Sequence, residues 1–440
     1  MHQSRRPFQK FTLTILIFAY IVTCCVSLVV CAHFHVPGSY FDPKAFHIFY
    51  DPARQSEAIA VVALFALVSA LFLYANSCIG YLVGFYLYAM ILGYLWLNCF
   101  SDFVYDHRLA AASAAVSAVG FLLPALFITS PLRRTYELSP WALDQVLRFI
   151  LWLCAITIAV AASYNFRLVA LEHIYDYRDK LEFPSVVNYL LGMLSSALLP
   201  FAFACFVMRK DYLRTGIALL LMLLFYPITL TKLAFFTPLW LIVMAVLSKL
   251  FGARIAVVLS LLGPTLTGVV AFTVLGNQAA DYFGVVNFRM SAIPSNAMDV
   301  YNDFFSRHDL TYFCQISILK PLINCPYREP LGLVMKKAYE LGNFNASLFA
   351  TEGIASVGLW FAPISAILCG LVIALGNRLS AGLPPRFILI SGAVLPQVFL
   401  NVPLTTTLLT HGAAVLALLW YLTPQSIFEQ KEPAAAAASY

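Results

Sequence analysis

Charged residues are scarce in this 440-residue chain, since Asp, Glu, Lys and Arg make up 11% of it and hydrophobic residues 61%. A soluble domain usually carries about 25% charged residues, so the composition excludes a water-soluble globular protein. Apolar runs of about 20 residues recur from end to end, which predicts an all-α polytopic membrane protein, because spanning segments must satisfy their own backbone hydrogen bonds. The net charge of +6 is ordinary for a membrane protein and does not indicate nucleic-acid binding.

Common motifs of catalysis and metal binding are also missing. The sequence has no Walker phosphate loop, no HExxH motif and no Cys/His cluster with metal-ligand spacing. The loops predicted to lie outside carry no DxD pair of the kind that holds a divalent metal on a sugar diphosphate. We therefore expect neither a cofactor nor a metal, and any bound diphosphate would be neutralised by Arg and Lys through charge-assisted hydrogen bonds.

We predict a single membrane domain over residues 1–425 with about twelve transmembrane helices, although tight connections leave eleven or thirteen open. No signal-peptide cleavage site follows the first apolar run, so we expect it to be retained. Lys and Arg gather in the short loops of one side, which places both termini in the cytoplasm. Residues 426–440 form a low-complexity tail that we predict to be disordered. The expected spans are 11–33, 57–75, 77–100, 109–130, 143–164, 186–208, 214–230, 233–249, 254–275, 346–376, 386–402 and 404–422.

Three long exoplasmic loops follow from this topology, at residues 34–56, 165–185 and 276–345. Long ordered loops on a compact scaffold are more often functional than idle. Cys314 and Cys325 both lie in the longest loop. An oxidising compartment would permit a disulfide between them, with two free thiols as the alternative.

The longest loop contains a segment with helical periodicity after Pro294. This pattern predicts an interfacial amphipathic helix that lies on the bilayer. Its two carboxylates, Asp299 and Asp303, are four residues apart and suit general acid–base catalysis, with a solvated surface face as the alternative. The apolar face holds Ala297, Met298, Tyr301, Phe304 and Phe305, and the polar face holds Asp299, Asn302, Asp303 and Ser306.

Other ionisable residues gather at the exoplasmic ends of the spans, which favours chemistry at the outer membrane surface over a transport path. Arg178 stands in a mixed-charge loop segment and either pairs with an anionic head group or is simply solvated. Lys232 is the only charge of a tight turn and either binds a phosphate or extends to the interface. Glu352 is a costly carboxylate at the mouth of an apolar helix, whereas His411, inside the last span, fits a packing role.

Five stretches of the sequence carry a resemblance to a known family. They are YRDKL (177–181), KLAFFTP (232–238), FRMSAIPSNAMDVYNDFFS (288–306), CPY (325–327) and NFNASLFATEGIASVGLW (343–360). Their order resembles that in the bacterial oligosaccharide repeat-unit polymerases, which include the O-antigen polymerases. Members of that family show a YYDFFS-like segment, then a proline-tyrosine pair, then an N-x-N…ADG…G stretch. Here Glu352 replaces the usual Asp, and the first half of the chain matches only by topology.

The resemblance implies a metal-independent, multi-pass glycosyltransferase of the bacterial inner (plasma) membrane. It would join oligosaccharide units carried on undecaprenyl diphosphate at the periplasmic face, with the bilayer as its environment and a chain-length regulator as an optional partner. The expected base is Glu352, Asp303 or His308. The expected diphosphate ligands are Arg289, Arg178 and Lys232, and the expected glycan ligands are Asn343, Asn345, Tyr301 and Tyr327, with helix capping as the alternative for the two asparagines.

Two other functions stay open at this stage, as does the product, which is O-antigen, capsule or exopolysaccharide. An O-antigen ligase, or another lipid-linked glycosyltransferase, would use the same donor and membrane face but another acceptor. A transporter or flippase would instead predict inverted repeats and broken helices with charges at the membrane midplane.

Overall fold

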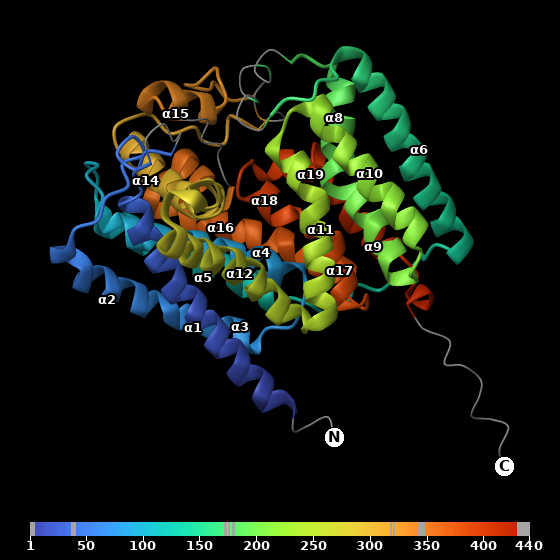
Figure 1. The fold of residues 1–440 in the computed structure, drawn as a ribbon, viewed down its shortest axis with the longest axis horizontal. Coiled ribbons are helices and arrows are strands. Elements are labelled where there is room, and N and C mark those ends of the chain that lie inside the picture. Colours follow the sequence, from blue (N-terminus) through green and yellow to red (C-terminus); the bar gives the residue numbers. More distant parts are fainter. Residues whose placement is uncertain are drawn as a thin grey trace. The chain divides into compact units, whose positions relative to one another are not determined.

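The computed structural model of the chain is helical throughout its described residues, with no strand among them (Figure 1). Ten of the described helices are long and apolar enough to cross a membrane. The prediction of an all-α, multi-pass membrane protein is therefore confirmed, with ten candidate spans where about twelve were expected. The described residues are 5–36, 41–170, 174, 177, 181–316, 319, 322–341 and 348–428, without the side chains of 5–8, 348 and 349.

Where a single membrane domain was expected, the chain divides into two compact units, each built from separate stretches of sequence. The predicted tail lies almost wholly outside the described residues. Unit 1 comprises Met1–Thr129, Leu250–Asn377 and Pro396–Thr407, and unit 2 comprises Ser130–Lys249, Arg378–Leu395 and Leu408–Tyr440.

Helix α4 (Ile79–Asn98) is the core of unit 1, because every one of its residues is buried. Its glycines allow close packing: a Cβ on Gly80 would lie 1.9 Å from the carbonyl oxygen of Ala125. Small residues of this kind let membrane helices approach each other closely. The helices that pack against α4 are α1 (Arg5–Ala32), α2 (Gln55–Ala66), α5 (His107–Phe127), α12 (Ala253–Leu275) and α14 (Ile293–Phe305). The candidate span that contains α2 begins with η1 (Pro52–Arg54) before it and ends with η2 (Leu67–Ser69) and α3 (Ala70–Tyr74) after it.

After α12 the chain turns at Gly276, whose φ of 58° is unfavourable for other residues, and folds back along α12. The Tyr282 hydroxyl donates to the Pro264 carbonyl at 3.2 Å, and the Asn287 amide donates to the Thr265 carbonyl at 2.9 Å. The expected loop 276–345 thus begins with a packed helical return. Its elements are η4 (Gly276–Ala279), α13 (Ala280–Phe283), the π-helix η5 (Gly284–Ala292) and α14.

The expectation that α14 lies on the bilayer surface is wrong, because all its residues from Ser295 to Phe305 are buried. Several of its polar side chains donate to partners inside the protein, although the Oδ1 atoms of Asn296 and Asn302 are buried without a partner among the described residues. Ser295 donates to the Met90 carbonyl at 3.0 Å, Asn296 to the Phe46 carbonyl at 2.8 Å and Asn302 to the Tyr94 hydroxyl at 2.8 Å. The sequence pattern identified two faces correctly, but both faces are covered.

Helix α16 (Gly353–Ser380) follows the π-helix η6 (Leu348–Glu352) and contains a reversal at Gly358. The backbone angles there are φ 73° and ψ 175°, a conformation essentially restricted to glycine. Gly353 packs against Ala362, since a Cβ on it would lie 3.3 Å from the Ala362 Cα atom. The apparent span is therefore a short helix over 348–357 that folds back on the longer helix that follows it.

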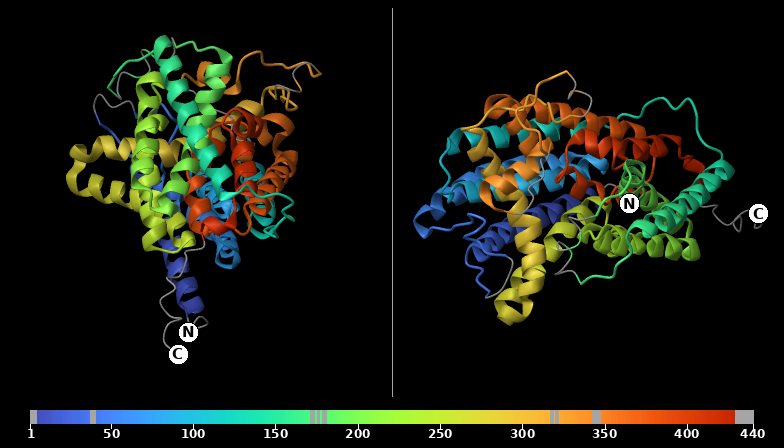
Figure 2. Two further views of the ribbon diagram at one scale, coloured as in Figure 1. Left: turned by 90° about the vertical axis from the view of Figure 1, so that its right-hand side faces the viewer. Right: turned by 90° about the horizontal axis from the view of Figure 1, so that it is seen from above.

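The described residues of unit 2 form four long helical segments and a set of short helices. Its C-terminal helices are interrupted at Gly392 and at Gly412, which has a φ of 73°. Residues 386–402 and 404–422, expected as two spans, are therefore short helices, and this accounts for the lower count of spans. The elements of unit 2, which are coloured along the chain in Figure 2, are α6 (Pro140–Tyr164), α8 (Ser185–Met193), η3 (Leu194–Leu198), α9 (Leu199–Arg209), α10 (Tyr212–Thr229), α11 (Lys232–Leu250), α17 (Pro385–Ser391), α20 (Ala413–Leu422) and η7 (Gln425–Ile427). Between α17 and α20, helices α18 (Leu395–Phe399) and α19 (Leu404–Leu409) lie mostly within Pro396–Thr407, which belongs to unit 1.

Candidate functional site

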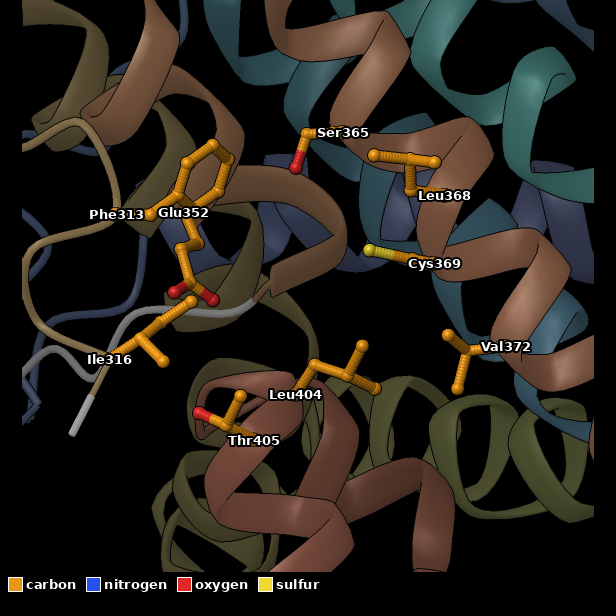
Figure 3. Close-up of a pocket in the computed structure, with 9 residues that line it drawn as sticks. All are labelled: Phe313, Ile316, Glu352, Ser365, Leu368, Cys369, Val372, Leu404 and Thr405. Carbon is orange, nitrogen blue, oxygen red and sulfur yellow. The ribbon is translucent and has the colours of Figure 1, made fainter. Parts of the chain in front are cut away.

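A cavity of about 140 Å³ in unit 1 surrounds the carboxylate of Glu352 (Figure 3). The side chain is 3% exposed, and its Oε2 atom has no hydrogen-bond partner among the described residues. Burying a charged carboxylate without partners costs several kcal/mol. The cavity is lined by Phe313, Ile316, Glu352, Ser365, Leu368, Cys369, Val372, Leu404 and Thr405.

The reversal at Gly358 brings Glu352 opposite the helix that follows it in the chain. Four lining residues of that helix stand at helical spacing and so share one face, which looks across the cavity toward Glu352 in Figure 3. Pro363 lacks an N–H, and the Leu359 carbonyl that it leaves free accepts a hydrogen bond of 2.5 Å from Ser113 of α5. This bond fixes the start of the longer helix. The four lining residues are Ser365, Leu368, Cys369 and Val372.

The loop over residues 311–316 forms another wall of the cavity. The Thr311 and Tyr312 N–H groups donate to the Ala355 and Ser356 carbonyls at 2.9 and 3.0 Å, just beyond Glu352 in the chain. Tyr312 and Phe313 have φ values of 47° and 62°, which are strained for residues other than glycine. Such strain costs about 1–3 kcal/mol per residue and clusters at functional sites.

A disulfide between Cys314 and Cys325 holds the same loop, so the structure has the disulfide of the two alternatives that the sequence left open. The side chain of Gln315 adds two hydrogen bonds, to the Tyr327 carbonyl at 3.0 Å and to the Glu329 carbonyl at 3.1 Å. Phe313 and Ile316 stand on either side of Cys314 and Gln315 in the sequence, and both line the cavity. The disulfide therefore positions one wall of the site.

The cavity borders an exposed apolar face of α16. Leu368 lines it and is nevertheless 58% exposed. Large apolar side chains at helical spacing continue this exposed face, which is the pattern of a helix side that faces lipid. They are Trp360, Phe361, Ile364, Ile367, Leu371 and Leu375.

Asp303, the second expected base, is equally buried but fully partnered. It accepts hydrogen bonds from the Arg307 guanidinium, from the Tyr339 hydroxyl at 2.5 Å and from the Val104 N–H at 3.4 Å. The Asp303 carboxylate raises the pKa of Arg307, and burial, with this hydrogen bond, raises the pKa of Tyr339. Asp299, one turn earlier, accepts from the Tyr105 hydroxyl. Both aspartates hold loops onto α14.

The remaining expected residues of unit 1 that the structure describes do not line the cavity. Tyr301 is fully buried in α14. His308 is exposed and stacks on Phe304, with ring centroids 3.9 Å apart. The Tyr327 hydroxyl donates to the Asp309 carbonyl at 2.8 Å, so Tyr327 ties the long loop together.

The expected diphosphate ligands do not line the cavity. Arg289 is exposed on η5 and is not among the residues that line the cavity. Lys232 begins α11 and belongs to unit 2. The described lining residues include no Arg or Lys. Arg178, Asn343 and Asn345 lie outside the described residues.

Sequence reasoning missed several residues that build the site. Ser365 and Cys369 are four residues apart on a membrane helix, and this spacing was the one signal that could have marked them. Phe313 gave no signal, because its place depends on the loop conformation. Arg307 follows Asp303 at helical i,i+4 spacing, so their ion pair was readable from the sequence.

Comparison with known proteins gives no match, whether with family models, with curated proteins or with solved structures.

Proposed function

We propose that this chain polymerises lipid-linked oligosaccharide repeat units at the exoplasmic, periplasmic face of the bacterial inner membrane. The observation that carries the proposal is the Glu352 carboxylate, buried without a partner for Oε2 among the described residues, in a cavity that borders an exposed apolar helix face. A substrate with a long hydrocarbon carrier approaches from lipid, so a site beside such a face suits it. The sequence resemblance to the repeat-unit polymerases supports the same substrate class.

In the proposed reaction Glu352 accepts the proton of an acceptor sugar hydroxyl. The hydroxyl oxygen attacks the anomeric carbon of the growing chain and forms the new glycosidic bond. The bond between that carbon and the diphosphate oxygen breaks, and undecaprenyl diphosphate leaves with the electron pair. A positioned general base contributes about 10²–10⁴-fold in rate, and orientation of the two substrates contributes about 7–11 kcal/mol.

Cavity size limits what part of the substrate enters. Ligand pockets usually measure about 300–1,000 Å³, and this cavity measures about 140 Å³. It therefore suits the reacting end of one sugar, with the rest of the glycan and both lipid carriers outside it. The aromatic ring of Phe313 in its wall provides an apolar surface for the C–H face of that sugar.

Glu352 is the preferred base among the three expected residues. Asp303 already accepts three hydrogen bonds, so a substrate proton would have to displace one of them. His308 is exposed and is held on Phe304 by stacking and by a 2.8 Å contact of Nδ1 with the Phe304 carbonyl. For the leaving diphosphate, Arg289 is the proposed cation, because its guanidinium is exposed and belongs to the same unit.

The test uses a strain that lacks the chromosomal copy of this gene and carries it on a plasmid. Wild-type protein should restore a ladder of long polysaccharides on a gel. Glu352→Gln should leave single repeat units attached to the final acceptor, whereas Glu57→Gln, on the exposed start of α2, should restore the ladder. A full ladder with Glu352→Gln would contradict the proposal. Long chains stranded on the lipid carrier in the deletion strain would indicate a ligase instead.

A transporter is the second candidate, because the helices between residues 385 and 422 are broken and residues 348–357 fold back on α16. Broken helices of this kind hold substrates in secondary transporters. Arg386, however, is the only residue with a fixed charge in the sequence between 385 and 422. A deletion strain separates the two functions: loss of a flippase leaves no repeat unit on the final acceptor, whereas loss of a polymerase leaves single units there.

A further inference from the structure

Unit 2 contains a cluster of three arginines around one aspartate. Asp144 of α6 lies 2.9 Å from the Arg148 guanidinium on the same helix. It also lies 3.5 Å from Arg209, at the end of α9, and 2.8 Å from Arg214, at the start of α10. A single carboxylate thus brings together basic side chains from three helices.

Positive charge is in excess at this cluster. Asp211 is the second carboxylate: its Oδ1 atom caps α10 by accepting the Arg214 backbone N–H at 3.1 Å, and its Oδ2 atom lies 3.5 Å from Arg214 Nε. Two carboxylates therefore face three arginines. Lys210 is exposed next to Asp211. A carboxylate offers about four lone-pair positions, whereas three guanidinium groups present about fifteen N–H donors. Since the Arg148 side chain is 54% exposed and that of Arg214 is 32% exposed, N–H groups are available to a ligand.

The cluster lies where three candidate spans begin or end. Arg209 is the last residue of one span, Tyr212 is the first of the next, and Asp144 stands near the start of the span that begins at Pro140. Trp141 and Tyr212 are 72% and 79% exposed. Exposed Trp and Tyr at span ends are typical of the level of lipid head groups. The cluster is thus set at the membrane–water interface, beside an apolar helix face.

We propose that Arg148, Arg209 and Arg214 form a binding site for the phosphate of an anionic phospholipid headgroup. Arginine forks match phosphate oxygens in pairs, which gives both charge and geometry. Asp144 holds the three guanidinium groups together and limits the net charge, so that one phosphate neutralises the remaining excess. A free phosphate ion has the same recognition chemistry, but it would make no use of the exposed aromatic rings. The site is separate from the proposed glycosyltransferase site in unit 1.

The test measures the unfolding temperature of the purified full-length chain in a neutral detergent. Phosphatidylglycerol, phosphatidylcholine and inorganic phosphate are added in separate titrations. Phosphatidylglycerol should raise the unfolding temperature in a saturable way, and the other two additions should leave it unchanged. An equal effect of inorganic phosphate would overturn the assignment to a lipid. An equal effect of phosphatidylcholine, whose head group has no net charge, would overturn the assignment to an anionic head group.

Substitutions of the arginines test whether the effect of phosphatidylglycerol depends on the cluster. Arg148→Gln combined with Arg209→Gln should raise the phosphatidylglycerol concentration needed for half of the effect at least tenfold. Lys249→Gln, an exposed cation in the last turn of α11 in the same unit, should leave that concentration unchanged. Arg148→Gln alone changes the most exposed of the three arginines and so carries less risk to folding. It should also raise the phosphatidylglycerol concentration needed for half of the effect, by a smaller factor. Equal titrations for these variants and the wild type would overturn the proposal.

Discussion

Asp303 and Glu352 are two carboxylates of unit 1 that are buried to nearly the same degree, at 1% and 3% exposure, in very different surroundings. Asp303 accepts hydrogen bonds from a guanidinium, a hydroxyl and a backbone N–H. Glu352 faces mostly apolar walls, and its Oε2 atom has no partner among the described residues. Burial alone therefore does not separate these two carboxylates; the number of hydrogen-bond donors around each of them does.

The difference has an energetic meaning. Each hydrogen bond to a charged group contributes about 1.5–3 kcal/mol to the stability of the fold, so removing a partnered carboxylate destabilises it. An unpartnered buried carboxylate already carries a desolvation cost, and replacing it with a neutral group relieves that cost. Asp303 should therefore matter mainly for stability and Glu352 mainly for activity, and both expectations can be measured.

The largest effect is expected for Glu352→Gln. Loss of a general base lowers the rate about 10²–10⁴-fold, whereas the amide has nearly the same shape and needs less desolvation. We expect polymer to fall at least about 100-fold, with an unfolding temperature equal to or above that of the wild type. Ladder analysis and thermal unfolding in detergent give the two readings. A variant that unfolds several degrees lower would show that Glu352 is structural, like Asp303.

The disulfide lies between Asp303 and Glu352 in the sequence, so removing it should affect both stability and activity. Changing both Cys314 and Cys325 to Ser removes the constraint on an 11-residue sequence separation, worth about 3 kcal/mol in the chain-entropy model. Because Phe313 and Ile316 flank Cys314, polymer length should fall together with stability. Cys99→Ser, at a free thiol of the same unit, is the matched control. Unchanged ladders would show that the loop wall keeps its place without the cross-link.

The fold was predictable from the sequence where hydrophobic length decides it. Apolar runs of about 20 residues gave the helical class and the candidate spans up to α12, because a membrane span needs little more than that pattern. Helix breaks were harder to foresee. Gly358, Gly392 and Gly412 interrupt apolar runs that read as continuous, and glycine is common enough in membrane helices to give no clear signal.

The site was predictable in part. Glu352 stood out because a carboxylate in an apolar run is costly, and that physical argument needs no structure. The two-faced pattern of α14 was read correctly, but the partners of its polar face come from α4 and from residues 46 and 104, far away in the sequence. Periodicity shows that a face is polar. It does not show whether water or protein satisfies that face.

A smaller effect is expected for Asp303→Asn. The amide keeps the shape but loses charge, and its NH₂ group cannot accept from Arg307 or Tyr339. We expect the free energy of unfolding to fall by about 2 kcal/mol, within the range for charge-assisted hydrogen bonds. Asp309→Asn, an exposed aspartate of the same loop, should change it by less than about 0.5 kcal/mol. Equal stabilities for the two variants would remove the contrast with Glu352.

The smallest effect is expected for Tyr339→Phe. It removes one donor to Asp303 but leaves the Arg307 guanidinium and the Val104 N–H in place, so the loss should be about 1 kcal/mol. Combined with Asp303→Asn, it should add little, because both changes remove the same contact and contacting residues are not additive. Thermal unfolding of both single variants and the double variant measures this coupling. Strict additivity would mean that the Tyr339 hydroxyl stabilises the loop through another partner, such as the Arg307 guanidinium, and not through the carboxylate.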